Sequence, residues 1–306
     1  MSTERAVVFG RAGSLVGVLT EAKDGHPDES TLGVILINAG VVHHVGPHRL
    51  YVDLARLLSE RGRTVLRFDH SGVGDSPARD DHLPFAESSV IEVHDAMDWL
   101  KRERGCTRFV LLGLCSGTLT AFRTASRDPR VVGLVLLTSL LEDPSTVSEE
   151  VIQQAVDRRI TRSYTSEKAF DAKSWKKLVT GQANYRQIAR VLAKRIQFFV
   201  ARPRKRAPRS SEVVVTLGTL LERGVSVLFI FGEPTTVLEY FRMTVEPFWN
   251  DLVSRGRIAL HVLQRSDHTF SASQHRQRIF ELITEWLTAF QSELEQASVA
   301  GPRSSE

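Results

Sequence analysis

A cysteine between two glycines is the first residue of this sequence with the setting of a catalytic group. The segment Gly113-Leu114-Cys115-Ser116-Gly117 follows an apolar run, and a stretch compatible with a helix comes directly after it. A Gly-x-Cys-x-Gly motif between a strand and a helix has the layout of a nucleophile elbow, with a thiol in place of the usual hydroxyl. The glycines leave room for strand and helix to approach, and the tight turn strains the central residue. The sequence therefore predicts that Cys115 is a nucleophile.

The predicted position of Cys115 at the amino end of a helix favours the thiolate, which attacks carbonyl carbon readily. Most free cysteines are buried and pack as small hydrophobic residues, and such a packing role is the alternative interpretation of Cys115. In an elbow, the backbone N–H of the residue after the nucleophile stabilises the oxyanion. Ser116 is therefore expected to donate through its backbone, while its side chain should matter little.

Length and composition indicate a soluble globular protein. With 306 residues, 42% of them hydrophobic, the chain can bury one large core, or a core and a small accessory domain. No apolar run reaches the roughly 18 residues of a membrane span, and the first residues lack the apolar region of a secretory signal. Cys106 and Cys115 are the two cysteines, which implies no disulfide framework. We expect a cytoplasmic protein.

Short apolar runs alternate with segments of helical spacing through most of the sequence. The predicted strands are residues 7–9, 15–19, 33–38, 64–68, 109–112, 131–137, 225–231 and 258–263. The clearest predicted helices are residues 49–60, 90–104 and 274–294, and the tail 297–306 is expected to be disordered. This alternation predicts the α/β class, with a mostly parallel sheet covered by helices on both faces.

The alternation is interrupted once, over residues 143–221, between a core formed by residues 1–142 and 222–296. The interruption has a helical pattern and is basic, because residues 151–210 hold 16 Lys and Arg against 3 Asp and Glu. An insertion at this point would lie over the carboxyl ends of the strands, so we interpret it as a helical lid. Its charge fits a solvated surface, or attraction of an acidic carrier of an acyl group, such as coenzyme A or phosphopantetheine. Its aromatic residues have helical spacing and are better explained as the core of the lid than as a nucleic-acid surface.

From about residue 5 to 295 the chain resembles the α/β-hydrolase superfamily, because its motifs follow the order of that superfamily. The matching pieces are Asn38-Ala39-Gly40-Val41 after a strand, the glycine-rich loop that follows residues 67–68, the elbow, the insertion, and Ser266-Asp267-His268. The sequence is most similar to serine-aminopeptidase-like hydrolases associated with bacterial exosortase systems, some of which have cysteine at the elbow. Dienelactone hydrolase is another member with a thiol there. The resemblance implies an α/β-hydrolase fold with a helical lid.

The same resemblance implies two further catalytic roles. His268 follows the last predicted strand, where the superfamily keeps its catalytic base, and the backbone N–H of Val41 corresponds to the second oxyanion donor. Among the other histidines, those near residue 45 have a spacing that matches no zinc motif, so we expect no metal and no cofactor. His94 and His261 lie within a predicted helix and a predicted strand, and we interpret both as structural.

The carboxylate that would orient the base is harder to assign. Superfamily members usually carry Asp shortly after the penultimate strand, and this chain has Thr235 at that position. Glu239 is the preferred candidate, because a longer side chain on the following segment could reach back to the imidazole. Glu233, Glu142 and Asp143 are the alternatives. A Cys–His pair also works without a strong orienting carboxylate, since a thiolate needs less activation than a hydroxyl.

The loop after residue 68 has a structural interpretation. Gly72 and Gly74 permit a sharp turn, and Asp69 and Asp75 are expected to accept hydrogen bonds from its backbone amides.

These features together predict an enzyme that acts on an ester or a thioester through Cys115 and His268, by hydrolysis or by acyl transfer. Its expected partner is a small-molecule or carrier-bound acyl substrate, with no nucleic acid. The rival hypothesis is a non-catalytic binding or scaffold protein that keeps the α/β-hydrolase fold, and the missing Asp near Thr235 favours it.

Overall fold

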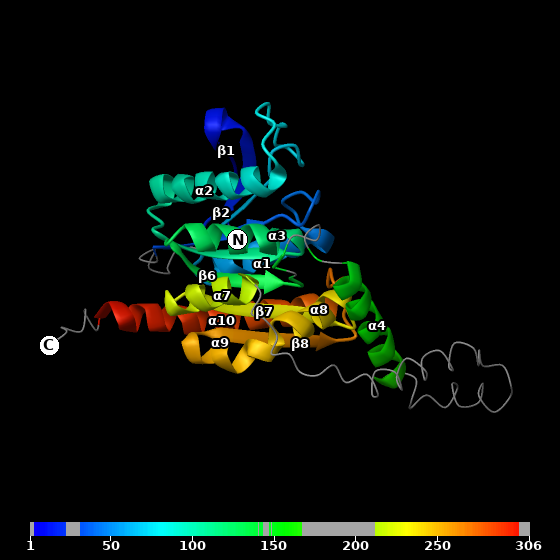
Figure 1. Ribbon diagram of the computed structural model, residues 1–306. Coiled ribbons are helices and arrows are strands. Elements are labelled where there is room, and N and C mark those ends of the chain that lie inside the picture. Colours follow the sequence, from blue (N-terminus) through cyan, green and yellow to red (C-terminus); the bar gives the residue numbers. More distant parts are fainter. Residues whose placement is uncertain are drawn as a thin grey trace.

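A single eight-stranded sheet forms the centre of the molecule (Figure 1). The computed structural model describes residues 3–22, 31–139, 141–142, 147, 149–166 and 212–299. The strands are β1 (Glu4–Phe9), β2 (Leu15–Thr20), β3 (Leu32–Ile37), β4 (Thr64–Phe68), β5 (Arg108–Leu114), β6 (Val131–Leu137), β7 (Ser226–Glu233) and β8 (Ile258–Gln264). Their order in the sheet is β1-β2-β4-β3-β5-β6-β7-β8.

The sheet is antiparallel at one edge and parallel elsewhere. β1 and β2 form a hairpin, and β2 pairs antiparallel with β4. Every later pairing, from β3 with β4 to β7 with β8, is parallel. Because parallel strands end at the same edge, the loops after β3, β5, β6, β7 and β8 gather at the carboxyl ends of the strands. The predicted α/β fold and all eight predicted strands are confirmed.

Helices cover both faces of the sheet (Figure 1). They are α1 (Leu50–Glu60), α2 (Phe85–Arg104), α3 (Ser116–Arg127), α4 (Glu149–Ser166), α7 (Glu212–Glu222), α8 (Thr236–Thr244), α9 (Trp249–Arg255) and α10 (Ser273–Val299), with short 3-10 turns η1 (Arg11–Gly13), η2 (Pro47–Arg49) and η3 (Glu246–Phe248). One core joins the sheet to α1 and α10, and the other joins it to α2, α3, α7, α8 and α9. Each leucine fully buried in these cores contributes roughly 1.5–3 kcal/mol to folding.

Two helix boundaries differ from the expected ones. α2 begins at Phe85 rather than near residue 90, because the carbonyl of Pro84 accepts from the amides of Glu87 and Ser88 and so starts the helix earlier. α10 continues to Val299, so the prediction of disorder from residue 297 is wrong at its start; the last turns consist mainly of good helix formers. Residues 300–306 lie outside the described residues.

The predicted lid, residues 143–221, is described only at its two ends. α4 and α7 are helical as expected, and α4 packs against α8. The rest of the predicted lid lies outside the described residues. No helix in the described part of the chain is long and apolar enough to cross a membrane.

Candidate functional site

Cys115 occupies a strained turn between β5 and α3. Its φ of 54° and ψ of −119° are values that residues with a side chain rarely adopt, and it is the N-cap of α3. Its backbone is held on both sides: its N–H donates to the carbonyl of Leu137 at 3.0 Å, and its carbonyl accepts from the amide of Thr118 at 3.1 Å. The residue itself is exposed. The backbone therefore presents the sulfur to solvent at the amino end of a helix.

The two glycines of the motif are required by close backbone contacts. A Cβ atom on Gly113 would lie 2.4 Å from the carbonyl carbon and oxygen of Gly117. A Cβ atom on Gly117 would lie 2.5 Å from the carbonyl oxygen of Asn38 and 2.6 Å from that of Ile37. The turn is thus packed against the end of β3 so tightly that no side chain fits at either position. These contacts give the predicted elbow the geometry that its sequence requires.

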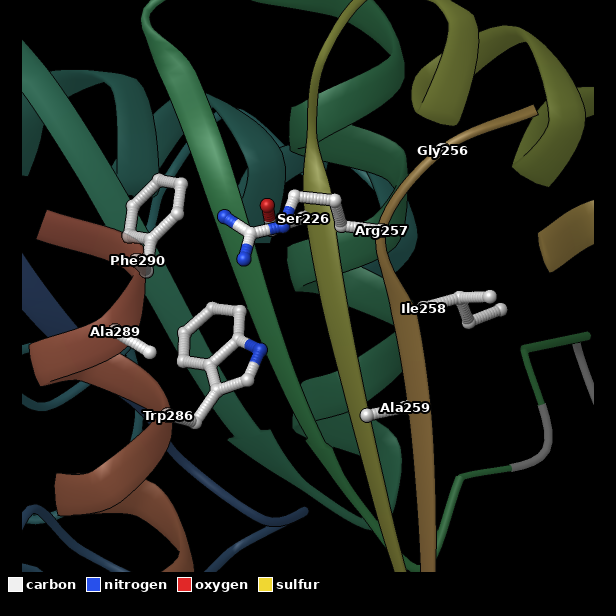
Figure 2. Close-up of a pocket in the computed structure, with 8 residues that line it drawn as sticks. All are labelled: Ser226, Gly256, Arg257, Ile258, Ala259, Trp286, Ala289 and Phe290. Atoms are coloured by element: carbon white, nitrogen blue, oxygen red, sulfur yellow. The ribbon is translucent and has the colours of Figure 1, made fainter. Parts of the chain in front are cut away.

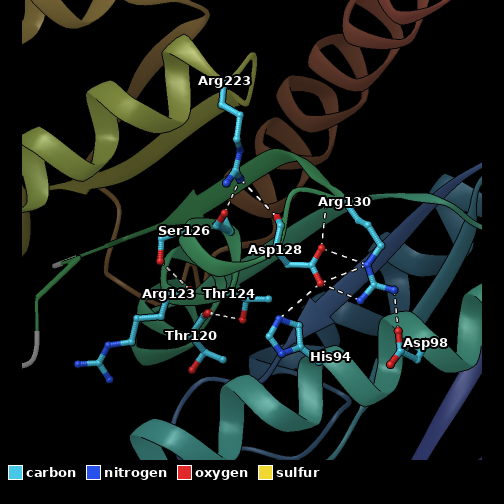
Figure 3. Close-up of polar contacts among 10 residues, drawn as sticks. His94, Asp98, Thr120, Arg123, Thr124, Ser126, Asp128, Arg130 and Arg223 are labelled. Atoms are coloured by element: carbon cyan, nitrogen blue, oxygen red, sulfur yellow. Dashed lines mark hydrogen bonds and ion pairs between the residues drawn. The ribbon is translucent and has the colours of Figure 1, made fainter.

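A polar network fixes the far end of the helix that begins at the elbow (Figure 3). Arg130 pairs with Asp128 at 2.7 Å and with Asp98 at 2.6 Å, which ties the end of α3 to α2. The Nε2 atom of His94 lies 3.5 Å from a carboxylate oxygen of Asp128, and Arg223 donates to the backbone carbonyl of Asp128 at 3.4 Å. His94 thus contacts a network remote from Cys115.

The loop after β3 is joined to the elbow through a side chain. The amide of Gly40 donates to the Oγ atom of Ser116 at 2.6 Å, and the turn around Gly40 is closed by the amide of Val42, which donates to the carbonyl of Ala39 at 3.0 Å. The Ser116 side chain therefore has a contact that the sequence did not predict. Val41, the expected second donor, follows Gly40 with a side chain that is 90% exposed, and its role stays a prediction.

The carboxylate of Asp69 holds the loop after β3 in place through hydrogen bonds. Asp69 is fully buried, and it accepts hydrogen bonds from the His44 ring at 2.8 Å, from the His44 amide, from the Asn38 side chain at 3.2 Å and from the Asp75 amide at 3.0 Å. Burial raises its pKa, but the hydrogen bonds from His44 and Asp75 outweigh burial and hold the pKa below its usual value. The predicted structural role of Asp69 is confirmed.

His44, Asp69 and Asp75 also offer three ligand atoms within 4.8 Å of one another, the spacing of a metal site. Both carboxylate oxygens of Asp69 already accept hydrogen bonds from N–H groups. The hydrogen bonds explain the cluster without an ion.

Tyr51 of α1 supports the end of β3 from the other face of the sheet. Its side chain is fully buried, and its hydroxyl donates to the carbonyl of Ile37 at 2.7 Å. Burial raises the pKa of Tyr51 well above its usual value, and the charge of a Cys115 thiolate adds to that rise. The phenol therefore lies beneath the elbow as a neutral hydrogen-bond donor.

The predicted base, His268, lies on a loop that packs on the end of β7. The Ser266 amide donates to the carbonyl of Glu233 at 3.1 Å, and a Cβ atom on Gly232 would lie 2.6 Å from the carbonyl oxygen of Ser266. Asp267 accepts from the amides and hydroxyls of Thr269 and Ser271. Burial raises the pKa of Asp267, but these hydrogen bonds outweigh it and hold the pKa well below its usual value.

The His268 side chain is exposed and has no hydrogen-bond or ion-pair partner among the residues that the structure describes. The preferred acid, Glu239, is buried on α8 and pairs with Arg242 at 2.8 Å. The same Arg242 nitrogen lies 2.8 Å from Glu233. Thr235, at the usual acid position, caps α8 by accepting from the Leu238 amide. In the described part of the chain, no carboxylate therefore orients the imidazole.

The remaining acid candidates follow β6. Glu142 accepts a hydrogen bond from the hydroxyl of Tyr240. Burial raises the pKa of Tyr240, and this hydrogen bond and the charge of Glu142 raise it further. Asp143 lies outside the described residues. Glu142 is thus held at the carboxyl end of the sheet, with a tyrosine rather than a histidine as its partner.

Backbone strain gathers at this same edge of the sheet. Besides Cys115, positive φ angles occur at Thr138 (50°) and Leu141 (59°) after β6, and at Arg265 (57°) and Phe270 (55°) on either side of His268. A β-branched residue such as Thr138 is a clear outlier at such an angle. Strained residues that do not belong to a simple turn tend to cluster at functional sites, and here they mark the carboxyl ends of β5, β6 and β8.

A pocket of about 250 Å³ lies elsewhere, against the amino ends of β7 and β8 (Figure 2). Trp286 and Phe290 of α10 stack on each other with ring centroids 5.4 Å apart and line one side of it. Ser226 and Ile258, the first residues of the two strands, line the other side. Since Cys115 follows the carboxyl end of β5, this pocket is at the opposite end of the sheet from the thiol.

The structure thus places Cys115, Ser116, Val41, His268 and Glu239 on loops and helices that follow the carboxyl ends of the strands. A hydrogen bond joins the elbow to the loop of Val41, and another joins the loop of His268 to the end of β7. Gly40, His44 and Tyr51 were missed by the sequence analysis. The position of Gly40 beside Val41 was a signal for its part in the oxyanion loop. The roles of His44 and Tyr51 depend on distant partners.

Comparison with known proteins agrees with the fold. The sequence profile of the serine aminopeptidase S33 family matches residues 29–194. No curated protein sequence matches the chain. Among solved structures, an esterase from Pyrococcus furiosus has a TM-score of 0.55 at 14% identity, over 94% of this chain and 91% of its own.

Two other solved structures are similar over almost their whole length. Dienelactone hydrolase from Anabaena variabilis has a TM-score of 0.52 at 15% identity, over 94% of this chain and 98% of its own. Proline iminopeptidase from Mycobacterium smegmatis has a TM-score of 0.53 at 18% identity, over the same shares of the two chains. At these identities the similarity establishes the α/β-hydrolase fold.

Proposed function

Because the chain belongs to the serine aminopeptidase S33 family of α/β-hydrolases, we propose that it is a cysteine-dependent hydrolase of esters or thioesters. The observation that carries the proposal is the backbone of Cys115, with a φ of 54° and a ψ of −119° between β5 and α3. Strain of this kind persists only where the surrounding structure enforces it, and here Gly113 and Gly117 allow that enforcement. An exposed thiol at such a turn is in the position of a nucleophile.

In the proposed reaction, His268 takes the thiol proton and the sulfur of Cys115 attacks the acyl carbon. A carbon–sulfur bond forms, and the electron pair of the carbonyl moves to its oxygen, where the Ser116 amide and the loop after β3 stabilise it. When the carbonyl re-forms, the bond to the leaving alcohol or thiol breaks, and the leaving group takes the proton from His268. Water then attacks the thioester and releases the acid and the free thiol; an acceptor alcohol or amine in place of water gives acyl transfer.

The orienting acid in this proposal is Glu239. Its carboxylate is buried on α8 beside Arg242, and α8 begins directly after β7. The burial of Glu239 near the end of β7 supports this role. Because Glu239 also pairs with Arg242, its carboxylate would have to bind both the guanidinium and the imidazole. A thiolate needs less activation than a hydroxyl, so a shared carboxylate suffices.

The direct test is acylation of the thiol. The protein is incubated with p-nitrophenyl acetate, the reaction is quenched in acid, and the digested peptides are identified by mass spectrometry. We expect one acetyl group on the peptide that carries Cys115, and a loss of at least about a thousandfold in ester turnover for Cys115→Ala. The matched control is Cys106→Ala, at the buried second cysteine. A Cys115 without label, with ester turnover unchanged in Cys115→Ala, would favour the non-catalytic binding protein.

The role of His268 is tested by the acylation rate at neutral and at alkaline pH. His268→Asn should lower the acylation rate at neutral pH by about a hundredfold, the usual contribution of a general base. The rate should recover at alkaline pH, where hydroxide takes the thiol proton. His261→Asn on the neighbouring β8 is the control and should behave as wild type. Equal rates in His268→Asn and wild type at neutral pH would remove His268 from the mechanism.

We further propose a carrier-bound acyl group as the substrate, because residues 151–210 concentrate positive charge. Acetyl-coenzyme A and the uncharged thioester of N-acetylcysteamine carry the same reacting group. We expect the coenzyme A thioester to be preferred at low ionic strength, and the preference to shrink in 0.5 M salt as the charges are screened (Debye length ~3–8 Å). An equal kcat/KM for the two thioesters at low salt would contradict the carrier-bound substrate and leave the thiol mechanism standing.

A further inference from the structure

The Ser116 hydroxyl bridges the elbow and the loop after β3 by a hydrogen bond. Its oxygen accepts the amide proton of Gly40 at 2.6 Å, across 76 positions of sequence. Both residues are exposed, so the bridge lies at the surface of the site rather than within the core.

The bridged loop has a fixed shape. Gly40 has a φ of +56°, and its turn is closed by the hydrogen bond from the Val42 amide to the Ala39 carbonyl. One residue earlier, the carbonyl of Asn38 lies against Gly117, where a Cβ atom would come within 2.5 Å. The loop is therefore docked on the elbow at two points, and the Gly40 amide faces the residue that follows the nucleophile.

The hydroxyl proton of Ser116 is available. The oxygen accepts from Gly40, but no acceptor for its own O–H occurs in the part of the chain that the structure describes. A hydroxyl whose oxygen accepts a hydrogen bond is polarised and becomes a better donor. Its bond to an ionised acceptor is stronger than a bond to a neutral one, so it gains strength as charge develops.

We propose that the Ser116 hydroxyl is a side-chain donor to the oxyanion, beside the backbone amide of the same residue. This inference rests on the proposed function. The oxygen of a carbonyl attacked by Cys115 must lie near the Ser116 amide, and the hydroxyl projects from that residue toward the loop that completes the hole. The hydroxyl is held by Gly40 before substrate arrives, so it donates without reorganisation.

The rival interpretation predicts the opposite change in the acylation rate when the hydroxyl is removed. If the hydroxyl only occupies the Gly40 amide, it competes with the substrate oxygen for that amide, and removing it opens the hole. Ser116→Ala then acylates faster than wild type. If the hydroxyl donates, Ser116→Ala acylates more slowly, because one donor to the developing charge is lost.

The experiment compares two reactions of the same thiol. Acylation by p-nitrophenyl acetate passes through an oxyanion. Exchange with an aromatic disulfide, 5,5′-dithiobis(2-nitrobenzoate), does not: a new S–S bond forms on Cys115 and a thionitrobenzoate leaves with the electron pair. In Ser116→Ala we expect acylation to fall about ten- to a hundredfold, up to the lower limit of the roughly hundred- to thousandfold loss for an oxyanion donor, because the backbone amide of Ser116 remains. Disulfide exchange should stay within about twofold of wild type.

Two further variants complete the test. Ser116→Thr keeps the hydroxyl and should restore most of the acylation rate, and Ser126→Ala, at the other end of α3, should match wild type in both reactions. An equal or faster acylation in Ser116→Ala overturns the inference, and so does an equal fall in both reactions, which would mean that the elbow itself is disturbed. A wild-type protein with unlabelled Cys115 overturns the proposed function as well, whereas a labelled wild type with an unaffected Ser116→Ala overturns this inference alone.

Discussion

The two halves of the candidate site are built in different ways. The nucleophile half is held by backbone: a Cβ atom on Gly113 or Gly117 would lie 2.4–2.6 Å from neighbouring main chain, and the Cys115 amide bonds to β6. In the histidine half the backbone of the loop is also fixed, because the Ser266 amide donates to the carbonyl of Glu233 at the end of β7. Its two proposed catalytic side chains, however, do not contact each other: Glu239 pairs with Arg242, and His268 has no partner among the described residues.

The difference shows which part of a hydrolase site the fold itself supplies. An elbow is a consequence of strand, turn and helix packing, so any chain that folds this way forms it. A base and its carboxylate depend on the choice of side-chain partners, which the fold permits but does not impose. Substitution of the closely packed glycines of the elbow should therefore act through stability, and substitution of His268 or Glu239 through rate and pH.

The largest effect is expected at the backbone contact of the elbow. Gly117→Ala would force a Cβ atom within 2.6 Å of two main-chain carbonyl oxygens that cannot move aside, so we expect a loss of at least about 3 kcal/mol in the free energy of unfolding. Urea denaturation measures it. In the control Gly218→Ala the new Cβ meets the flexible side chain of Arg255, and the effect should be small. Equal stability of both variants would remove the main support for a packed elbow.

The second effect concerns the carboxylate beneath the oxyanion loop. Asp69→Asn removes the charge and part of the acceptor capacity that four N–H groups use, so we expect a loss of about 2 kcal/mol in unfolding free energy. Asp80→Asn, at an exposed position of the loop that follows β4, is the control. Asp69→Asn should also slow acylation, because the loop after β3 loses its anchor. A stable variant with an unchanged rate would show that the loop does not need Asp69 as its anchor.

The third effect tests whether the histidine half assembles during the reaction. Glu239→Gln should lower the acylation rate about tenfold, equivalent to about 1.4 kcal/mol, because a thiolate depends less on an orienting carboxylate than a hydroxyl does. The fold should be unaffected, with Glu246→Gln as the control. A rate that does not change would leave Glu239 as a structural partner of Arg242, and would sharpen the contrast between the two halves.

The smallest effect is in the loop of His268. Because the pKa of Asp267 is lowered in the folded state, its stabilisation is present above the unfolded value of about 3.9 and is lost as the pH falls below it. Asp267→Asn should cost less than about 1 kcal/mol at pH 7, since solvent screens a partly exposed carboxylate. Its urea midpoint should also fall less steeply than that of wild type between pH 4 and 2. Parallel curves for the two proteins would contradict the hydrogen-bonded loop.

Sequence reasoning predicted the sheet and the elbow because both are local. Each strand is a short apolar run, and the elbow is a five-residue motif whose glycines have one structural meaning. The start of α2 at Phe85 was missed, because the Pro84 carbonyl that begins it is not part of the apolar periodicity.

The partners of the site residues could not be predicted in the same way. Ser116 and Gly40 are 76 positions apart, and no periodicity connects them. His44 gave a weak signal as a histidine near the oxyanion loop, but its partner Asp69 belongs to another strand end. Likewise, nothing in the spacing of Glu239 showed that Arg242, rather than His268, would be its neighbour. Such choices are made by tertiary packing.

The phenol of Tyr51 has a consequence for motion. Its hydroxyl donates to the Ile37 carbonyl, and the same carbonyl packs against Gly117 of the elbow. Helix α1, the end of β3 and the elbow are therefore connected by consecutive contacts. We therefore expect small displacements of α1 to be passed on to Cys115 through Tyr51, a residue 64 positions before it.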